Sequence, residues 1–201
     1  MKNLFRPALL LAAGTLALAS CKKDDETTPV TPAAQAQTVN SLSAAGTASA
    51  TGQPIPAKHY TFYSLADNKQ IAYTDSNSTK WDVAFRGTNV LTNGGSSGPG
   101  QGGAKVYSGT FESLTTAETT GYSVDAVSAL ATAGWYSYNS TTHVVTPVAG
   151  RILAIRTATG KYAKMEIMSY YQNAPAAPTS ANPSGYYTFR YVYQPNGTSL
   201  K

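Results

Sequence analysis

The chain carries few side chains of the types that catalyse reactions. It has two histidines, His59 and His143, one cysteine, Cys21, and ten acidic residues among 201. No closely spaced carboxylate pair stands out, and no G-x-S-x-G sequence is present, so acid–base and nucleophilic catalysis lack their usual residues. A hydrolase would need a cleft with a histidine paired to a carboxylate. A zinc site would need four ligands that this composition scarcely supplies. We therefore expect a protein that is not an enzyme.

A glycine-rich run is the other candidate for chemistry. Residues 98–103 read Gly-Pro-Gly-Gln-Gly-Gly, which formally matches G-x-G-x-x-G. A dinucleotide site needs that motif between a strand and a helix, whereas here it follows a turn and strand residues come next. The resemblance to a phosphate loop also fails, because Lys105 is displaced by one position and no Ser or Thr follows it. We expect the run to be a loop held against a β core by Trp81 and Phe85.

The elements that would position these residues are strands. Aromatic and β-branched residues dominate the apolar content, with 14 tyrosines in the chain, and this composition favours strands. Alternation and turn residues predict a hairpin over 59–73, and further strands at 81–86, 89–92, 105–108, 135–138, 143–146, 151–157, 162–171 and 186–194. The segment Ser123–Ala133 is the only plausible helical turn. The sequence predicts an all-β, antiparallel, single domain with at most one short helix.

The last strand carries a four-aromatic stripe. Tyr187, Phe189, Tyr191 and Tyr193 share one face, opposite Thr188 and Arg190. Such a stripe favours a buried core, and a platform for stacking sugars or oligonucleotides is the alternative. In the strand before it, Ala163, Met165 and Ile167 alternate with Lys164, Glu166 and Met168.

The N-terminus has the pattern of a bacterial lipoprotein. Residues 1–20 combine Lys2 and Arg6 with a short apolar core, which is typical of a signal peptide and too short to span a bilayer comfortably. The sequence Leu-Ala-Ser-Cys ending at Cys21 resembles a lipobox, and the alternative is an ordinary signal peptide with an incidental cysteine. We expect acylation of Cys21, which would anchor the chain to the membrane by lipid alone.

Residues 21–54 are expected to form an acylated N-terminus and a flexible tether. The charged start, Lys22-Lys-Asp-Asp-Glu26, precedes a stretch of Thr, Pro, Ala, Ser, Gln and Gly that cannot bury enough apolar surface to order itself. The remaining residues, 55–201, have the length of one domain. Their 11 Lys and Arg and 7 Asp and Glu give a net charge of +4 without a basic cluster. We therefore expect no nucleic-acid partner.

An ordered set of short segments resembles the HmuY family, the haem-binding surface lipoproteins and haemophores of Bacteroidota. The segments that carry the resemblance are Trp81–Phe85, Thr92–Gly94, Ser97–Gly103, Gly121–Asp125, Arg156–Lys164 and Tyr187–Tyr193. They span most of the domain, from about Tyr60 to Tyr193, and they follow the family's order. The charged start after Cys21 is similar to the export tag of surface lipoproteins in the same bacteria, which implies an outer-membrane protein exposed at the cell surface.

The resemblance implies haem capture and iron acquisition, with handover to a TonB-dependent outer-membrane haem transporter. In the family, two histidines or methionines hold the iron. One lies between the Gly-Tyr-x-Val-Asp motif and the next Gly-Trp, and the other lies just beyond that Trp. Here the first segment shrinks to Ala126–Ala133, which holds no His, Met or Tyr. Near the second position stands Ser140, with His143 three residues further on.

Haem iron accepts imidazole, thioether or phenolate, and the porphyrin lies between apolar walls. The candidate iron ligands are therefore His143 and Met168, with no metal expected beyond the haem iron. A ligand pair among His59, His143, Met165 and Met168 would have to face each other across about 4 Å, roughly twice an iron–nitrogen bond. Tyr136, Tyr138, Tyr170 and Tyr171 are predicted to pack against the porphyrin or to fill the core. The alternative function is a non-catalytic surface module on the same scaffold that binds a glycan, a peptide or a partner lipoprotein.

Overall fold

Strands make up nearly all of the regular structure in the computed structural model, which describes residues 34–48, 54–55 and 57–201. In chain order the elements are β1 (Ala36–Ser43), β2 (Thr47–Ala48), β3 (Pro54–Ile55), β4 (Thr61–Ser64), β5 (Lys69–Ile71), the 3-10 helix η1 (Tyr73–Asp75), β6 (Val83–Arg86), β7 (Asn89–Thr92), β8 (Gly103–Ser108), β9 (Tyr136–Asn139), β10 (Val144–Pro147), β11 (Arg151–Arg156), β12 (Tyr162–Tyr171) and β13 (Ser184–Gln194). The all-β, antiparallel fold class is confirmed.

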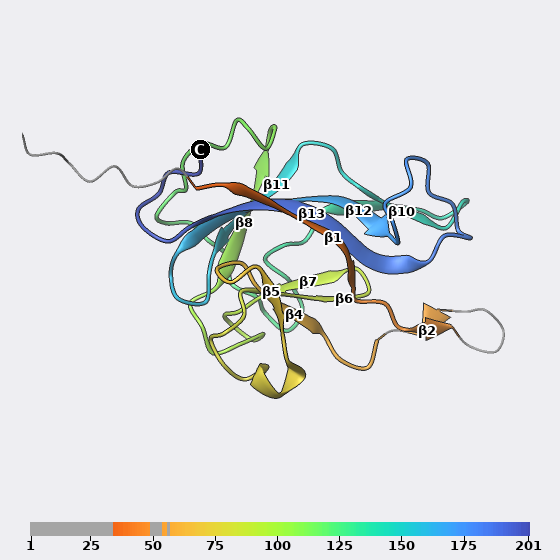
Figure 1. Cartoon of the computed structure of the whole chain (residues 1–201), viewed down its shortest axis with the longest axis horizontal. Coiled ribbons are helices and arrows are strands. Elements are labelled where there is room, and N and C mark those ends of the chain that lie inside the picture. The colour runs from red at the N-terminus through yellow and green to blue at the C-terminus, as the bar shows by residue number, and fades with distance from the viewer. Residues whose placement is uncertain (1–33, 49–53, 56) are drawn as a thin grey trace, which may run out of the picture. The chain divides into compact units, whose positions relative to one another are not determined.

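Two sheets form the body of the domain. The larger has the order β1-β13-β12-β11-β8, and the smaller has the order β5-β4-β6-β7. All of their neighbouring strands pair antiparallel. The larger sheet lies above the smaller one in Figure 1. The strands predicted at 151–157, 162–171 and 186–194 are present as the neighbouring strands β11, β12 and β13, and the predicted hairpin over 59–73 is present as β4 and β5.

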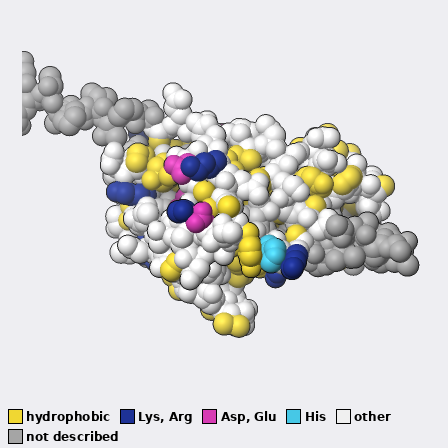
Figure 2. All heavy atoms as spheres, turned by 60° about the horizontal axis from the view of Figure 1, so that its bottom comes forward, with side chains coloured by type: hydrophobic (Ala, Val, Ile, Leu, Met, Phe, Trp, Pro, Cys, Tyr) yellow, Lys and Arg dark blue, Asp and Glu magenta, His cyan; other side chains and the backbone are white. Residues whose placement is uncertain are grey.

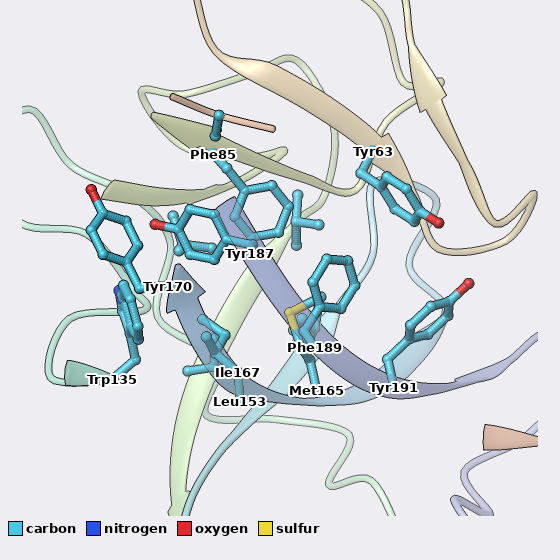
Figure 3. Packing of buried hydrophobic residues seen from close by; sticks show 14 of the residues in the cluster. Tyr63, Phe85, Trp135, Leu153, Met165, Ile167, Tyr170, Tyr187, Phe189 and Tyr191 are labelled. Carbon is cyan, nitrogen blue, oxygen red and sulfur yellow. The ribbon is translucent and has the colours of Figure 1, made fainter. Parts of the chain in front are cut away.

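The aromatic stripe of β13 fills the space between the two sheets. Tyr187, Phe189 and Tyr191 have no exposed surface, and Figure 3 shows their rings together with Phe85 of β6. The Phe85 ring centroid lies 5.4 Å from that of Phe189 and 4.6 Å from that of Tyr187. Met165 of β12 is fully buried in the same cluster. The interpretation of the stripe as core is confirmed.

The opposite face of the larger sheet is covered by residues 110–118 and by the C-terminus. Phe111, Leu114 and Leu200 pack there on Ile152 and Val192. The ammonium group of Lys164 is buried on this face and donates to the carbonyls of Phe111 (2.7 Å) and Leu114 (2.9 Å). Burial lowers the pKa of Lys164 below its ordinary value. The central part of the larger sheet is thus packed on both of its faces.

Part of the expected tether belongs to the sheet. Residues 36–43, inside the range 21–54, form β1, which extends the larger sheet beside β13. Val39 pairs with Phe189 and Leu42 with Tyr187. Both side chains pack on the core between the two sheets, which we call the main core. A polar segment can join an edge in this way because the backbone supplies the hydrogen bonds. The expected signal peptide over 1–20 and the expected acylation site Cys21 lie outside the described residues.

The helical turn predicted over Ser123–Ala133 is wrong. This segment consists of turns and two isolated bridges, one between Ser123 and Ala104 and one in which Ala126 and Ala129 each donate to the other's carbonyl. The side chain of Asp125 accepts a hydrogen bond from the Ala131 amide, so a side chain takes up a backbone donor that helix formation would have to satisfy. Among the described residues, no helix is long and apolar enough to cross a membrane.

Candidate functional site

A cavity of about 650 Å³ opens on the outer face of the smaller sheet. This volume lies inside the range of about 300–1,000 Å³ that small-molecule sites occupy. Four parts of the chain supply its walls: the region of β4, η1 with the residues after it, the end of β7 with the glycine-rich loop, and the segment after Asp125. The lining residues are Tyr60, Phe62, Tyr73, Ser76, Asn77, Leu91, Gly95, Ser96, Ser97, Gly98, Pro99, Ala126, Val127 and Leu130.

Asn93 organises the glycine-rich wall. Its side-chain amide donates to the carbonyls of Ser78 (2.8 Å) and Trp81 (2.7 Å), and its Oδ1 accepts from the Gly100 amide (3.0 Å). A Cβ on Gly98 would lie 2.2 Å from Asn93 Oδ1 and 2.8 Å from the Trp81 ring. Glycine is therefore needed at this position because of close packing. The expectation that Trp81 helps to hold this loop against the core is confirmed, whereas Phe85 lies in the core between the two sheets, against Tyr187 and Phe189.

Asp125 joins two of the four cavity walls, the one formed by β7 and the glycine-rich loop and the one formed by the segment that follows it. Its buried carboxylate accepts hydrogen bonds from the amide of Thr92 at the end of β7 (2.8 Å) and from that of Ala131 (2.9 Å). Its backbone carbonyl accepts from the Ser96 amide in the glycine-rich loop (2.8 Å). One residue thus fixes β7, the loop and the segment 126–130 relative to one another.

Asp82 plays a similar part beneath the loop, between the smaller sheet and the β11–β12 turn. Its carboxylate accepts from the amides of Leu65 (2.8 Å) and Ala158 (3.1 Å). Burial raises the pKa of Asp82 above its ordinary value, although these backbone donors oppose the shift. Both donors are backbone amides, so Asp82 holds the loop after β4 and the β11–β12 turn in place.

The charges around the cavity are sparse. None of its lining residues is charged. The Arg86 guanidinium lies 4.3 Å from the centre of the Tyr60 ring, and Lys80 pairs with Asp75 at 2.9 Å. Figure 2 shows acidic side chains beside Lys and Arg side chains on this face, without a broad basic patch. The cavity itself is a neutral, aromatic-walled site.

His143 does not reach this cavity. It is exposed at the turn between β9 and β10, with φ of 57°, and its Nδ1 lies 2.7 Å from the Tyr138 hydroxyl. The following Val144 and Val145 are buried in the main core. The structure therefore places His143 at the exposed tip of a hairpin that is anchored by its neighbours.

Met168 and Met165 lie apart from the cavity as well. Met168 is 43% exposed on β12, whereas Met165 is fully buried in the main core. Tyr170 and Tyr171 are buried in that same core, Tyr136 packs against it, and Tyr138 is exposed. The expected ligand candidates thus have separate surroundings, and neither described cavity is lined by any of them.

His59 is the histidine nearest to a cavity wall. His59 is exposed, and the centroid of its ring lies 3.8 Å from that of Tyr73. Tyr60, Phe62 and Tyr73 were not among the site residues predicted from the sequence. Their aromatic character in the predicted hairpin was the available signal, but the wall that faces them comes from residues 95–99 and 126–130.

Comparison with known proteins identifies the family. The family model described as HmuY protein matches residues 57–191, which is more than half of the chain. No curated protein matches the sequence. Three solved structures are similar at low identity. A structure described as a HmuY-like heme binding protein, from Bacteroides vulgatus, is 15% identical, with 79% of this chain and 90% of that chain covered and a TM-score of 0.49.

A lipoprotein of Bacteroides fragilis is 16% identical over 80% of this chain and 90% of that chain, with a TM-score of 0.46. The apo form of an HmuY analogue from Tannerella forsythia is 13% identical over 81% of this chain and 96% of that chain, with a TM-score of 0.42. The assignment rests on the family model and on its extent along the sequence. The chain belongs to the HmuY family.

Proposed function

We propose that this chain is a cell-surface lipoprotein that binds haem in the aromatic-walled cavity and passes it to an outer-membrane haem uptake system. One observation carries the choice of site. The segment that follows Gly121–Asp125, where the family resemblance implies an iron ligand, supplies Ala126, Val127 and Leu130 to the cavity wall. In this chain that segment is short and lines the cavity with apolar side chains.

The walls of the cavity include the kind of apolar and aromatic surface on which a porphyrin packs. Phe62, Leu91 and Leu130 supply apolar surface, and Tyr60 and Tyr73 supply aromatic rings. A flat apolar ligand is bound mainly by such surfaces, with a few polar groups for orientation. Of the side chains that ligate haem iron, those on the walls are phenols, so the cavity fits haem held by a phenolate and lacks a pair of imidazoles or thioethers.

The remaining parts of the proposal concern location and partners. Acylation at Cys21 would hold the chain on the outer membrane, and a TonB-dependent transporter would receive the haem. The assignment to the HmuY family and the neutral, aromatic-walled site support binding as the function.

A second function is favoured by one feature of the cavity. Its walls combine aromatic rings with Ser76, Asn77, Ser96 and Ser97 and carry no charge. This mixture also suits a neutral glycan, whose apolar faces pack on aromatic rings while its hydroxyls meet polar groups. In that case the chain is a non-catalytic binding module on the HmuY scaffold.

Titration of the full chain with hemin, followed by absorbance of the Soret band, tests the main proposal. We expect a saturable Soret shift. The same titration of His143→Ala and of Met168→Ala tests the two ligands expected from the sequence, and each remains a candidate only if its removal abolishes the shift. Absence of any shift in both ferric and ferrous states would reject haem binding and leave the glycan proposal, which binding assays on a glycan array then address.

A further inference from the structure

The cavity walls hold two side chains that can ligate haem iron, and both are tyrosines, Tyr60 and Tyr73. We propose that Tyr73 is the iron ligand, as a phenolate, that His59 positions its ring, and that Arg86 pairs with a propionate. This assignment rests on the proposed haem-binding function and replaces the histidine and methionine ligands expected from the sequence. It concerns residues on η1, on the segment before β4 and on β6.

Tyr73 is the more accessible of the two phenols. It begins η1, lines the cavity and is 54% exposed, so its side chain is open to a ligand there. The Tyr60 ring is half-buried beneath Arg86, and its hydroxyl lies 3.5 Å from the Asn89 amide. Tyr60 therefore serves better as a wall than as a ligand.

The two tyrosines that line the other described cavity are less exposed than Tyr73. It is smaller, about 290 Å³, and Tyr191 and Tyr193 line it. The Tyr191 hydroxyl already donates to Asn68 Oδ1 at 2.9 Å, and its ring has no exposed surface. Tyr73 is thus the phenol whose surroundings leave room for an iron ion.

Two aromatic neighbours hold the Tyr73 ring in place. The His59 imidazole lies against it, with centroids 3.8 Å apart and planes inclined by 32°. The Phe62 ring, which lines the cavity, lies 6.4 Å from it. Such contacts restrict the rotamers of Tyr73, and restriction before binding reduces the entropy that the ligand must remove. His59 is therefore a positioning residue in this proposal.

Arg86 supplies positive charge beside the same cavity. Its guanidinium covers the ring of Tyr60, a wall residue, at 4.3 Å. Among the described residues Arg86 has no carboxylate partner within salt-bridge distance. A porphyrin carboxylate can therefore meet an unengaged cation at this edge, in the bidentate geometry that guanidinium favours.

Coordination forms one iron–oxygen bond. The phenol of Tyr73 releases its proton to solvent, and its oxygen displaces the water or hydroxide bound to ferric iron. No change in oxidation state is needed. Axial-ligand identity sets the properties of haem iron. A single phenolate on ferric haem gives a high-spin spectrum, whereas two imidazoles, or imidazole with thioether, give a low-spin spectrum.

The experiment compares ferric hemin complexes of the full chain with those of four variants. Tyr73→Phe removes the phenol and keeps the ring, and Tyr138→Phe is the matched control at an exposed tyrosine outside the cavity. His59→Ala and Arg86→Gln test the positioning residue and the propionate partner. Absorbance and electron paramagnetic resonance report the spin state, and circular dichroism verifies the fold.

We expect a high-spin ferric complex for the full chain and for Tyr138→Phe. Tyr73→Phe should lose the phenolate spectrum and bind hemin at least about tenfold more weakly. His59→Ala should alter the electron paramagnetic resonance signal while high-spin iron is kept, and Arg86→Gln should weaken affinity without changing the spectrum. If hemin binds and Tyr73→Phe retains the spectrum of the full chain, this inference is wrong while the proposed function stands. If hemin does not bind at all, the proposed function itself fails.

Discussion

At the scale of single residues, the buried polar side chains of the sequence motifs form hydrogen bonds with backbone groups. Asn93 and Asp125 are buried, and their partners are mainly backbone amides and carbonyls of the cavity walls. Buried polar groups of this kind must be satisfied, and removing one partner leaves an uncompensated group. The motifs therefore identify the framework of the site, while the surfaces that a ligand would touch come from neighbouring side chains.

Asn93→Asp should destabilise the fold with almost no change in size. A carboxylate accepts hydrogen bonds but cannot donate to the carbonyls of Ser78 and Trp81, which lie 2.8 Å and 2.7 Å from the amide nitrogen. We expect the free energy of unfolding to fall by roughly 3 kcal/mol at neutral pH. Urea denaturation measures it, with the exposed Asn196→Asp as the control. Equal stability of the two variants would show that the Asn93 bonds do not hold the loop.

At the scale of elements, the sequence predicted the strands far better than the cavity. Alternation between Ala163, Met165 and Ile167 and their neighbours set the face of β12 correctly, because a strand has a period of two. The prediction of a helical turn that includes residues 126–130 was wrong, because the apolar residues of this segment line a cavity wall instead of forming one face of a helix. No local pattern brings that segment to η1, since their proximity depends on the loops joined by Asp125 and Asn93.

The glycine-rich loop gives a test at this scale. In Gly98→Ala the new methyl group would meet Asn93 Oδ1 and the Trp81 ring well inside van der Waals distance. We expect a loss of about 2 kcal/mol or more in the free energy of unfolding.

Gly197→Ala is the comparison for this loop. Gly197 has φ of 82° and open space around its Cβ position, so only the left-handed backbone opposes alanine, at about 1 kcal/mol. Thermal or urea unfolding measures the loss in the free energy of unfolding for both variants. A smaller loss for Gly98→Ala than for Gly197→Ala would contradict the close packing of the loop.

At the scale of the whole molecule, buried tyrosines tie stability to alkaline pH. Burial raises the pKa of Tyr122 and of Tyr170 to about 12, and it also raises the pKa of Tyr187. In the unfolded chain these phenols ionise near pH 10. Their contribution to stability is therefore complete below about pH 10 and is lost as the pH rises toward about 12.

This predicts unfolding of the molecule between about pH 10 and pH 12. Tyrosinate absorbance and circular dichroism, recorded on the same samples, measure it. We expect the ionisation of the buried tyrosines to coincide with loss of the β signal. Complete ionisation near pH 10 with the β signal unchanged would mean that these rings are open to solvent.

The central claim is that the aromatic-walled cavity is where this HmuY-family chain binds haem. Ala126 lines the cavity and is exposed, so Ala126→Trp would fill the space without entering the core. Ala149→Trp, at an exposed turn away from the cavity lining, is the control. In a hemin titration followed at the Soret band, we expect saturable binding for the full chain and Ala149→Trp and none for Ala126→Trp. Equal binding by both variants would contradict it.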